Sequence, residues 1–384
     1  MKSRVLNHDV TMKLHVPESF AISSKEHTYP VLFVHGAHGE QFFETVVGIV
    51  KHLASRERMP EVLVVSLNDI GEIPEVTTHG MWGREKIGGS GDASAHLRHL
   101  REEVFPYLEQ NYRANHYRMI VGVSGSSLFP VFALTEATDL FESYILVAAA
   151  DIVGMGYDED SNFIDTFEKI FRTTPERRTK LYVGVADHDT ENKPHHVENL
   201  EELKKRLGHL KGLDLKVEVV PDEDRYAVLI RSMLTAMTQN FPDKLWSSRY
   251  RELIAQPGDA LENIDRHYQD LSKKYGFTIL PRVDRWNNVN SLRSATRLLI
   301  QQDRPAEAHA VALRRIEYQP TVPGSHAGLA DALESLGQLK AAVDAQKTAV
   351  DLAKRQGSED LEALEQRLLE LRAAQNDEET PPSD

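Results

Sequence analysis

The sequence predicts an α/β protein with a doubly wound, mainly parallel sheet, followed by a C-terminal all-α domain of helical repeats. Over the first 245 residues, short unbroken apolar runs alternate with segments of helical spacing, as in chains whose parallel strands are buried on both faces. Beyond residue 245 these runs stop, and from residue 291 apolar positions recur at a fixed interval. A length of 384 residues also suggests two domains.

Seven segments are predicted to form strands. Residues 31–34 show the pattern well, because an unbroken apolar run suits a strand that is covered on both faces. Helical spacing predicts helices at 42–55, at 92–112 with Asp92 as the N-cap, and at 126–137. The predicted strands are 10–16, 30–35, 62–67, 119–122, 145–148, 181–185 and 215–220.

After the first domain, 1–245, the sequence predicts helices only. We expect a helical connector over 246–290, helical repeats over 291–375, and a disordered acidic tail over 376–384. Three residue pairs are separated by 34 positions, the period of tetratricopeptide helix pairs. These pairs are Leu299/Leu333, Ala308/Ala342 and Ile316/Val350. Roughly two repeats fit, too few to stand alone, so they are expected to pack on the first domain or on a second copy of the chain.

Composition excludes several functions. The formal net charge of −14 disfavours nucleic acid and anionic lipid as main partners, because both require a basic surface. The chain has no cysteine, which excludes disulfides, thiol catalysis and thiolate-bound metals. No apolar run approaches the length of about 18 residues that spans a membrane, and residues 1–10 lack a signal pattern. We therefore expect a cytoplasmic protein, or a periplasmic one if a leader has been removed.

One short motif carries most of the functional prediction. The strand predicted at 119–122 runs into Val123, Ser124 and Gly125, and then into an apolar helix. A serine at such a tight turn is a nucleophile elbow, in which the hydroxyl is exposed above the carboxyl edge of the sheet and the flanking residues are small. Ser124 is the predicted nucleophile. The N–H of Gly125, with one from Ala37 in the loop after the second strand, would stabilise the oxyanion.

The residues around this motif resemble the putative-esterase family of α/β-hydrolases, which includes esterase D and the enterobactin-type siderophore esterases. The resemblance covers about residues 1–245 and rests on stretches at 29–32, 97–107, 117–124, 128–129, 133–134 and 139–141. It implies an α/β-hydrolase fold and serine-dependent ester hydrolysis. The family's elbow usually reads G-H-S-F-G-G. In this chain Ser126 occupies the position of the first of the two final glycines.

Chain order in this fold runs serine, acid, histidine. Asp187 and Asp189 follow the sixth predicted strand, and Asp187 is the preferred acid. The family's base segment resembles P-D-E-x-H-G-S, but this chain has Arg225 at the histidine position. A guanidinium stays protonated in proteins and cannot accept the serine proton. We expect Arg225 to face Ser124. It would hold an anionic substrate group or a carboxylate from 222–224, and the alternative is a surface arginine in a loop that has lost its catalytic task.

Other side chains are candidates for further roles. His38, His79 or His188 would serve as a substitute base if its loop reached the serine, although each is better explained as a loop or surface histidine. His38 and Trp82 are expected to line the substrate opening. The group Asp187-His188-Asp189 with His195-His196 lacks metal-ligand spacing, so neither a metal nor another cofactor is expected.

Two functions stay open. The first is hydrolysis of a carboxylic ester through Ser124, which the elbow favours. The second is a catalytically inactive hydrolase fold that uses its helical tail as a binding or scaffold surface, which Arg225 favours. The expected partners are a small ester substrate or a protein bound by the C-terminal helices, and a homodimer is a further expectation.

Overall fold

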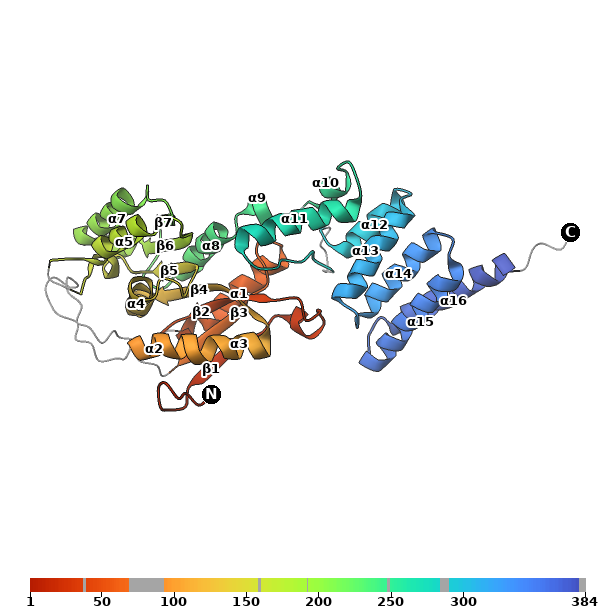
Figure 1. Ribbon diagram of the computed structural model, residues 1–384, viewed down its shortest axis with the longest axis horizontal. Coiled ribbons are helices and arrows are strands. Elements are labelled where there is room, and N and C mark those ends of the chain that lie inside the picture. The colour runs from red at the N-terminus through yellow and green to blue at the C-terminus, as the bar shows by residue number, and fades with distance from the viewer. Residues whose placement is uncertain are drawn as a thin grey trace. The chain divides into compact units, whose positions relative to one another are not determined.

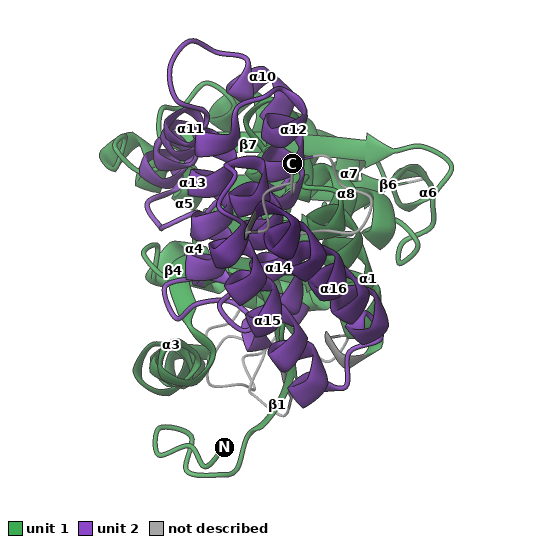
Figure 2. Ribbon diagram, turned by 90° about the vertical axis from the view of Figure 1, so that its right-hand side faces the viewer, with its two compact units in different colours: residues 1–17, 29–246 green, residues 18–28, 247–384 purple. Residues whose placement is uncertain are grey.

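The computed structural model describes residues 1–36, 39–68, 93–157, 160–191, 193–246, 249–283 and 290–379. The chain divides into two compact units (Figure 2). The first comprises Met1–Pro17 and Tyr29–Trp246, and the second comprises Glu18–Thr28 and Ser247–Asp384. The main division lies close to the boundary expected at residue 245. The short segment Glu18–Thr28 belongs to the second unit, which no sequence pattern indicates.

The first unit is built on a seven-stranded sheet with the order β1-β3-β2-β4-β5-β6-β7 (Figure 1). β1 runs antiparallel to β3, and the other neighbouring pairs are parallel. The doubly wound, mainly parallel sheet predicted from the apolar runs is therefore confirmed. The strands are β1 (Thr11–His15), β2 (Tyr29–Val34), β3 (Leu63–Asn68), β4 (Ala114–Val123), β5 (Ser143–Val147), β6 (Thr179–Ala186) and β7 (Leu213–Val220).

β4 is longer than the sequence predicts. It begins at Ala114, before the apolar run starts, and Ala114 pairs with Tyr29 of β2. Pro30 has no N–H to donate to the ladder, and the register between β2 and β4 shifts between Tyr29 and Val31. The apolar run marks only the part of β4 that is buried between neighbouring strands.

Two groups of helices pack around the sheet. α1 (Gly39–Ser55) contacts α8 (Leu229–Asn240), and in the second group α2, α4, α5 and α7 contact one another in succession. The remaining bounds are α2 (Ala93–His99), α3 (Phe105–Tyr112), α4 (Leu128–Glu136), α5 (Phe163–Thr173), α6 (Asp187–Thr190), α7 (Pro194–Leu207) and α9 (Asp243–Trp246).

The helix predicted at 92–112 is a single helical stretch with an irregular centre. A π-helical turn at Leu100–Val104 joins α2 to α3. Pro106 explains the irregularity, because it cannot donate the hydrogen bond that an α-helix needs four residues back, and its ring crowds that carbonyl. The predicted cap, Asp92, lies outside the described residues.

The second unit consists of helices throughout its described residues. The predicted connector 246–290 supplies α10 and α11 of this unit. Consecutive helices from α12 to α16 contact one another, and α12 also contacts α14 (Figure 1). A 3-10 turn at Glu18–Ala21 leads to Ser24, whose N–H donates to the Tyr318 carbonyl at 2.8 Å. The helices are α10 (Tyr250–Ile254), α11 (Ala260–Tyr275), α12 (Leu292–Gln301), α13 (Pro305–Tyr318), α14 (Pro323–Ser335), α15 (Leu339–Gln356) and α16 (Leu361–Glu379).

The residues of the 34-position pairs are mostly buried between these helices. Leu299, Leu333, Ala308, Ala342 and Val350 are all in the core of the second unit. Their assignment to the tetratricopeptide class stays a prediction that rests on the spacing.

The predicted disorder from residue 376 is wrong over 376–379, because α16 continues to Glu379. The sequence has no glycine or proline from the start of α16 until Pro381, so nothing in the backbone ends the helix earlier. Residues 380–384 lie outside the described part of the chain. None of the described helices is both long and apolar enough to cross a bilayer.

Candidate active site

Ser124 lies at a sharp turn between β4 and α4. β4 ends at Val123, and a 3-10 turn over Ser124–Ser127 leads directly into α4. The φ angle of Ser124 is +53°, in the left-handed region that costs a residue with a side chain about 1–3 kcal/mol. The surrounding packing must hold the residue in this conformation, as expected of an elbow.

The two glycines beside Ser124 have different roles. A Cβ added to Gly122 would lie 2.7 Å from both the Ser126 carbonyl oxygen and the Ser127 Cα. A Cβ added to Gly125 would meet nothing within 4 Å. The prediction that every flanking residue must be small is therefore right for Gly122 and wrong for Gly125, because the turn folds back over the strand and away from the residue after the serine.

The guanidinium of Arg225 covers the Ser124 hydroxyl. Nε and Nη2 of Arg225 both donate to Ser124 Oγ, at 3.2 and 3.0 Å. Ser124 is only 8% exposed, whereas the sequence predicts an exposed hydroxyl. Arg225, which comes from the segment after β7, is one of the groups that lie against this hydroxyl. The expected position of Arg225, facing Ser124, agrees with this geometry.

Two carboxylates hold the guanidinium in place. Asp151 Oδ2 lies 3.5 Å from Nη2 of Arg225, and Asp189 Oδ1 lies 3.5 Å from Nη1. Both acidic side chains are well shielded, at 3% and 11% exposure. A carboxylate from 222–224 is one of the partners expected for Arg225, and this alternative is wrong, because the carboxylates beside Arg225 follow β5 and β6 instead. Since two carboxylates already balance the arginine, an anionic substrate group is not needed there.

Asp151 is the site residue that the sequence reasoning misses. It follows β5 after Ala148, which has a φ of +53°, and its Oδ1 accepts the N–H of Ile152 at 2.9 Å. The signal was available. Parallel strands end at one edge of a sheet, so an acid shortly after β5 has the same claim to the site as Asp187, which directly follows β6.

Asp187 anchors the segment that carries Arg225. Its Oδ2 accepts the N–H of Asp222 at 2.9 Å, and its Oδ1 accepts those of Glu223 and His188 at 3.1 and 2.9 Å. The hydrogen bonds from Asp222 and Glu223 are the main cause that lowers the pKa of Asp187. Within the described residues this carboxylate orients the backbone after β7, and it binds no histidine ring.

No histidine within the described residues hydrogen-bonds Ser124. His188 instead bonds Asp224, with Nδ1 3.1 Å from Oδ1, and this bond is the first cause that raises the pKa of His188. The His195 and His196 rings meet edge to face, with centroids 4.5 Å apart. The candidates Ala37, His38, His79 and Trp82 lie outside the described residues.

Two further histidines lie in the core close to the elbow. His35 follows β2 directly, and its ring stacks on Phe129 of α4 at 4.3 Å and on His96 of α2 at 5.4 Å. Burial lowers the pKa of His35 to about 3, and burial also lowers the pKa of His96. Both rings are therefore neutral near pH 7 and serve as packing groups. Among the described residues, no cluster of three or more His, Asp or Glu side chains is placed to hold a metal ion.

These features define the class of the protein. A serine in a left-handed turn after a central strand of a doubly wound, mainly parallel sheet belongs to the α/β-hydrolase fold. The chain is a member of the family described as Putative esterase, whose model matches residues 3–211. The matched residues include Ser124 and Asp187 and end before Arg225. No curated protein matches the sequence.

Solved structures extend the likeness beyond the first unit. An IroE-like serine hydrolase from Shewanella oneidensis superposes with a TM-score of 0.59 at 17% identity, over 82% of this chain and 96% of that one. An uncharacterised protein from Capnocytophaga ochracea gives a TM-score of 0.54 at 14% identity, over 97% and 98% of the two chains. At these identities the likeness shows the fold, and the second match covers the helical unit as well.

Proposed function

We propose that this chain is a carboxylic-ester hydrolase in which Ser124 is the nucleophile and Arg225 replaces the usual histidine. One observation supports the proposal above the others: two N–H groups of Arg225 donate to Ser124 Oγ. Membership of the esterase family supports an ester as the substrate class. A small neutral ester fits better than an anionic one, because the charge of Arg225 is already balanced by Asp151 and Asp189.

The chemistry follows from what a guanidinium can do. Oγ of Ser124 would attack the ester carbonyl, and the oxyanion would be held by the Gly125 N–H and an N–H of the loop at Ala37. The ester C–O bond would then break, and the alkoxide would take a proton from water and leave as the alcohol. A second water would hydrolyse the acyl-serine, which releases the carboxylic acid and restores the Ser124 hydroxyl. Arg225 stabilises negative charge on Oγ but cannot accept its proton, so that proton must leave to water or hydroxide. General-base assistance is typically worth about 10²–10⁴-fold, so turnover should be slow.

This scheme predicts an unusual pH profile. Hydrolysis of p-nitrophenyl acetate by the wild type should rise steadily with pH, because no histidine titrates in the rate. Arg225→His should hydrolyse faster and level off above the pKa of the new imidazole. Ser124→Ala should be inactive, and Arg231→His is a matched control, since Arg231 is an exposed arginine of α8 that bonds Pro221 and Glu223.

A fluorophosphonate label, measured by intact mass, tests the same site without turnover. We expect slow labelling of the wild type, faster labelling of Arg225→His and none of Ser124→Ala. Brisk wild-type hydrolysis that levels off near pH 7 and disappears in Ser124→Ala would show that another base acts. That result would refute the role proposed for Arg225.

The alternative is a hydrolase fold that binds without catalysis. The observation that favours it is the use of Asp187, whose oxygens accept three backbone N–H groups rather than a histidine N–H. Under this alternative, neither the wild type nor Arg225→His would hydrolyse p-nitrophenyl acetate faster than Ser124→Ala. The same set of variants therefore separates the two functions.

A further inference from the structure

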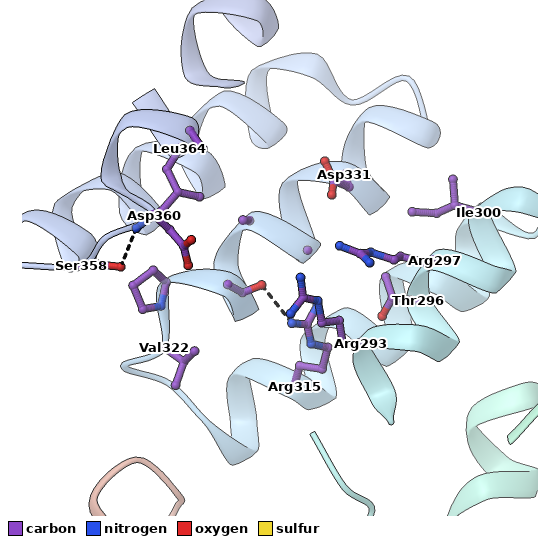
Figure 3. A pocket seen from close by; sticks show the side chains of 15 residues that line it. Arg293, Thr296, Arg297, Ile300, Arg315, Val322, Asp331, Ser358, Asp360 and Leu364 are labelled. Carbon is purple, nitrogen blue, oxygen red and sulfur yellow. Dashed lines mark hydrogen bonds between the residues drawn. The ribbon is translucent and has the colours of Figure 1, made fainter. Parts of the chain in front are cut away.

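The second unit contains a cavity of about 450 Å³ on which three arginines converge (Figure 3). The cavity is bounded by α12, by α14 and by the turn between α15 and α16, and Arg315 of α13 forms part of its base. Its size is in the range of ligand sites, which typically measure about 300–1,000 Å³. Nothing in the esterase chemistry of the first unit uses it.

The arginines give one side of the cavity a positive charge. Arg293 and Arg297 are four residues apart on α12 and therefore lie on the same face of that helix. Arg315 is only 2% exposed, and one of its hydrogen bonds goes to the neutral carbonyl of Gly324, from Nη2 at 2.9 Å. Arg297 is exposed and makes no ion pair or side-chain hydrogen bond with the described residues. An anion entering here would meet a guanidinium with its donors available.

Small residues on α14 keep the cavity open. Gly324, Ala327 and Gly328 line it. A Cβ at Gly328 would lie 2.0 Å from Nη1 of Arg315, so glycine is what allows this guanidinium to lie against the helix. A Cβ at Gly324 would meet nothing within 4 Å. The wall therefore leaves room for a main chain next to the arginines.

The opposite side of the cavity carries negative charge. Figure 3 shows Asp360 across the cavity from Arg293 and Arg297. Asp331 also lines the cavity, but it is already paired with Arg367, 3.1 Å away. A ligand that carries only negative charge would be repelled by Asp360. A ligand with carboxylates at one side and N–H donors at the other satisfies both walls.

We propose that this cavity binds a short acidic peptide segment. Its Asp or Glu carboxylates bind Arg293 and Arg297 through charge-assisted hydrogen bonds, and its backbone N–H groups face Asp360. The volume suits a few residues. This site is separate from the esterase function and does not depend on it.

The test is fluorescence anisotropy on the full chain. The probe is a labelled pool of hexapeptides, blocked at both ends and composed of Glu, Asp, Gly and Leu. A second pool with Gln and Asn in place of the acids is the control. Arg297→Gln should weaken binding of the acidic pool about tenfold or more, because it removes a charged donor. Arg372→Gln, an exposed arginine of α16 that does not line the cavity, should leave binding unchanged.

A second variant guards against a surface effect at Arg297. Gly328→Ala should displace Arg315 and also weaken binding, with the fold checked by circular dichroism. Three results would overturn the proposal: no binding of the acidic pool at millimolar concentration, equal binding of the amide pool, or equal loss in Arg372→Gln. Competition by free glutarate or inorganic phosphate as strong as that of unlabelled peptide would show that the cavity takes small anions instead, and this too would refute a peptide site.

Discussion

Replacing Glu103 by glutamine should release the N-terminal segment from the first unit. Glu103 lies in the π-helical turn between α2 and α3, and its side chain is 6% exposed. Its carboxylate accepts hydrogen bonds from Ser3 Oγ at 2.6 Å, from His99 Nδ1 at 2.7 Å, and from the Arg4 and Val5 N–H groups at 2.8 and 3.4 Å. One buried acid therefore fixes the start of the chain to the helical stretch.

The size of the effect follows from the pKa of Glu103. Burial raises this pKa, but the hydrogen bonds from Ser3, His99 and the two N–H groups outweigh burial and lower it from 4.5 to about 2. That difference corresponds to about 3 kcal/mol in favour of the folded state at neutral pH. Because the folded pKa lies below the unfolded one, the contribution is complete above about pH 4.5 and is lost as the pH falls toward 2.

Hydrogen exchange measured by mass spectrometry reports on this directly. In Glu103→Gln at pH 7, a peptide covering residues 1–9 should exchange up to about 100-fold faster, which is the factor that about 3 kcal/mol implies. The difference in stability between wild type and variant should shrink as unfolding is measured at lower pH. Glu102→Gln is the matched control, because Glu102 is exposed and adjacent. Unchanged exchange in Glu103→Gln, or an equal change in Glu102→Gln, would show that the carboxylate does not hold the segment.

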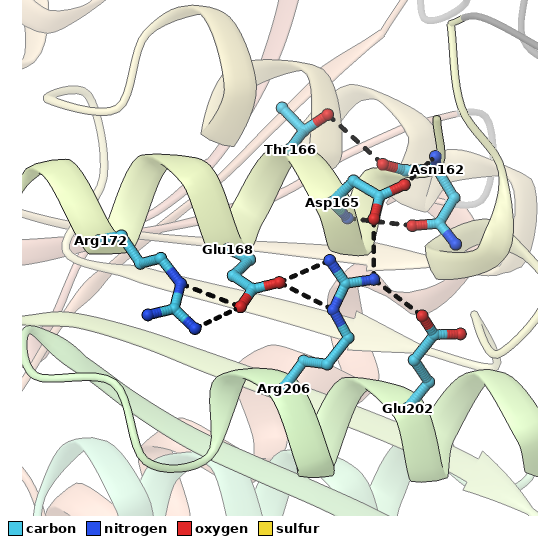
Figure 4. Close-up of polar contacts among 7 residues, drawn as sticks. All are labelled: Asn162, Asp165, Thr166, Glu168, Arg172, Glu202 and Arg206. Atoms are coloured by element: carbon cyan, nitrogen blue, oxygen red, sulfur yellow. Dashed lines mark hydrogen bonds and ion pairs between the residues drawn. The ribbon is translucent and has the colours of Figure 1, made fainter. Parts of the chain in front are cut away.

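Two further predictions concern the elbow and the outer helices of the first unit. Gly122→Ala should destabilise the protein by about 1–3 kcal/mol, because the new Cβ would meet backbone atoms at 2.7 Å. Gly125→Ala is the control and should be close to neutral, because its Cβ would meet nothing within 4 Å. Equal melting temperatures for the two variants would refute this prediction. Arg206 of α7 bonds Asp165, Glu168 and Glu202 at once (Figure 4), so Arg206→Gln should cost about 1–2 kcal/mol, and less in 1 M salt. Arg172 is more exposed and, among the described residues, pairs only with Glu168, so Arg172→Gln should cost under about 0.5 kcal/mol. A urea titration that ranks the two variants in the opposite order would contradict the network argument.

The sheet could be predicted well because its central strands, β2 to β6, are mostly buried and contain unbroken apolar runs. The edge strands β1 and β7 are partly exposed, yet all seven strands occur close to their predicted positions. The places that were missed are those where a long-range contact decides the local structure. The first residues of β4 are polar and are strand only because they pair with β2. Likewise, nothing in the segment Glu18–Thr28 itself indicates that it belongs with helices near Tyr318.

The site could be predicted only in part, for a related reason. The elbow follows from local sequence, and the position of Arg225 follows from chain order together with the resemblance to the family's base segment. The partners of Arg225 do not, because Asp151 and Asp189 approach it from two different strand ends. Chain order predicts one acid for the site, and Asp187 is the preferred one. In the structure the Asp187 carboxylate instead accepts hydrogen bonds from backbone N–H groups. A rule that considers every acid just after a parallel strand would have included Asp151.

The pairing of Ser24 with Tyr318 has a consequence for synthesis on the ribosome. The segment Glu18–Thr28 is made early, but its hydrogen-bond partner at Tyr318 is about 290 residues further along the chain. At about 5–20 residues per second, the segment Glu18–Thr28 is synthesised roughly 15–60 seconds before its partner. If the first unit folds during that interval, it does so before the partner of Ser24 exists. Release of the nascent chain before Tyr318, the last residue of α13, would therefore leave the segment Glu18–Thr28 without this partner.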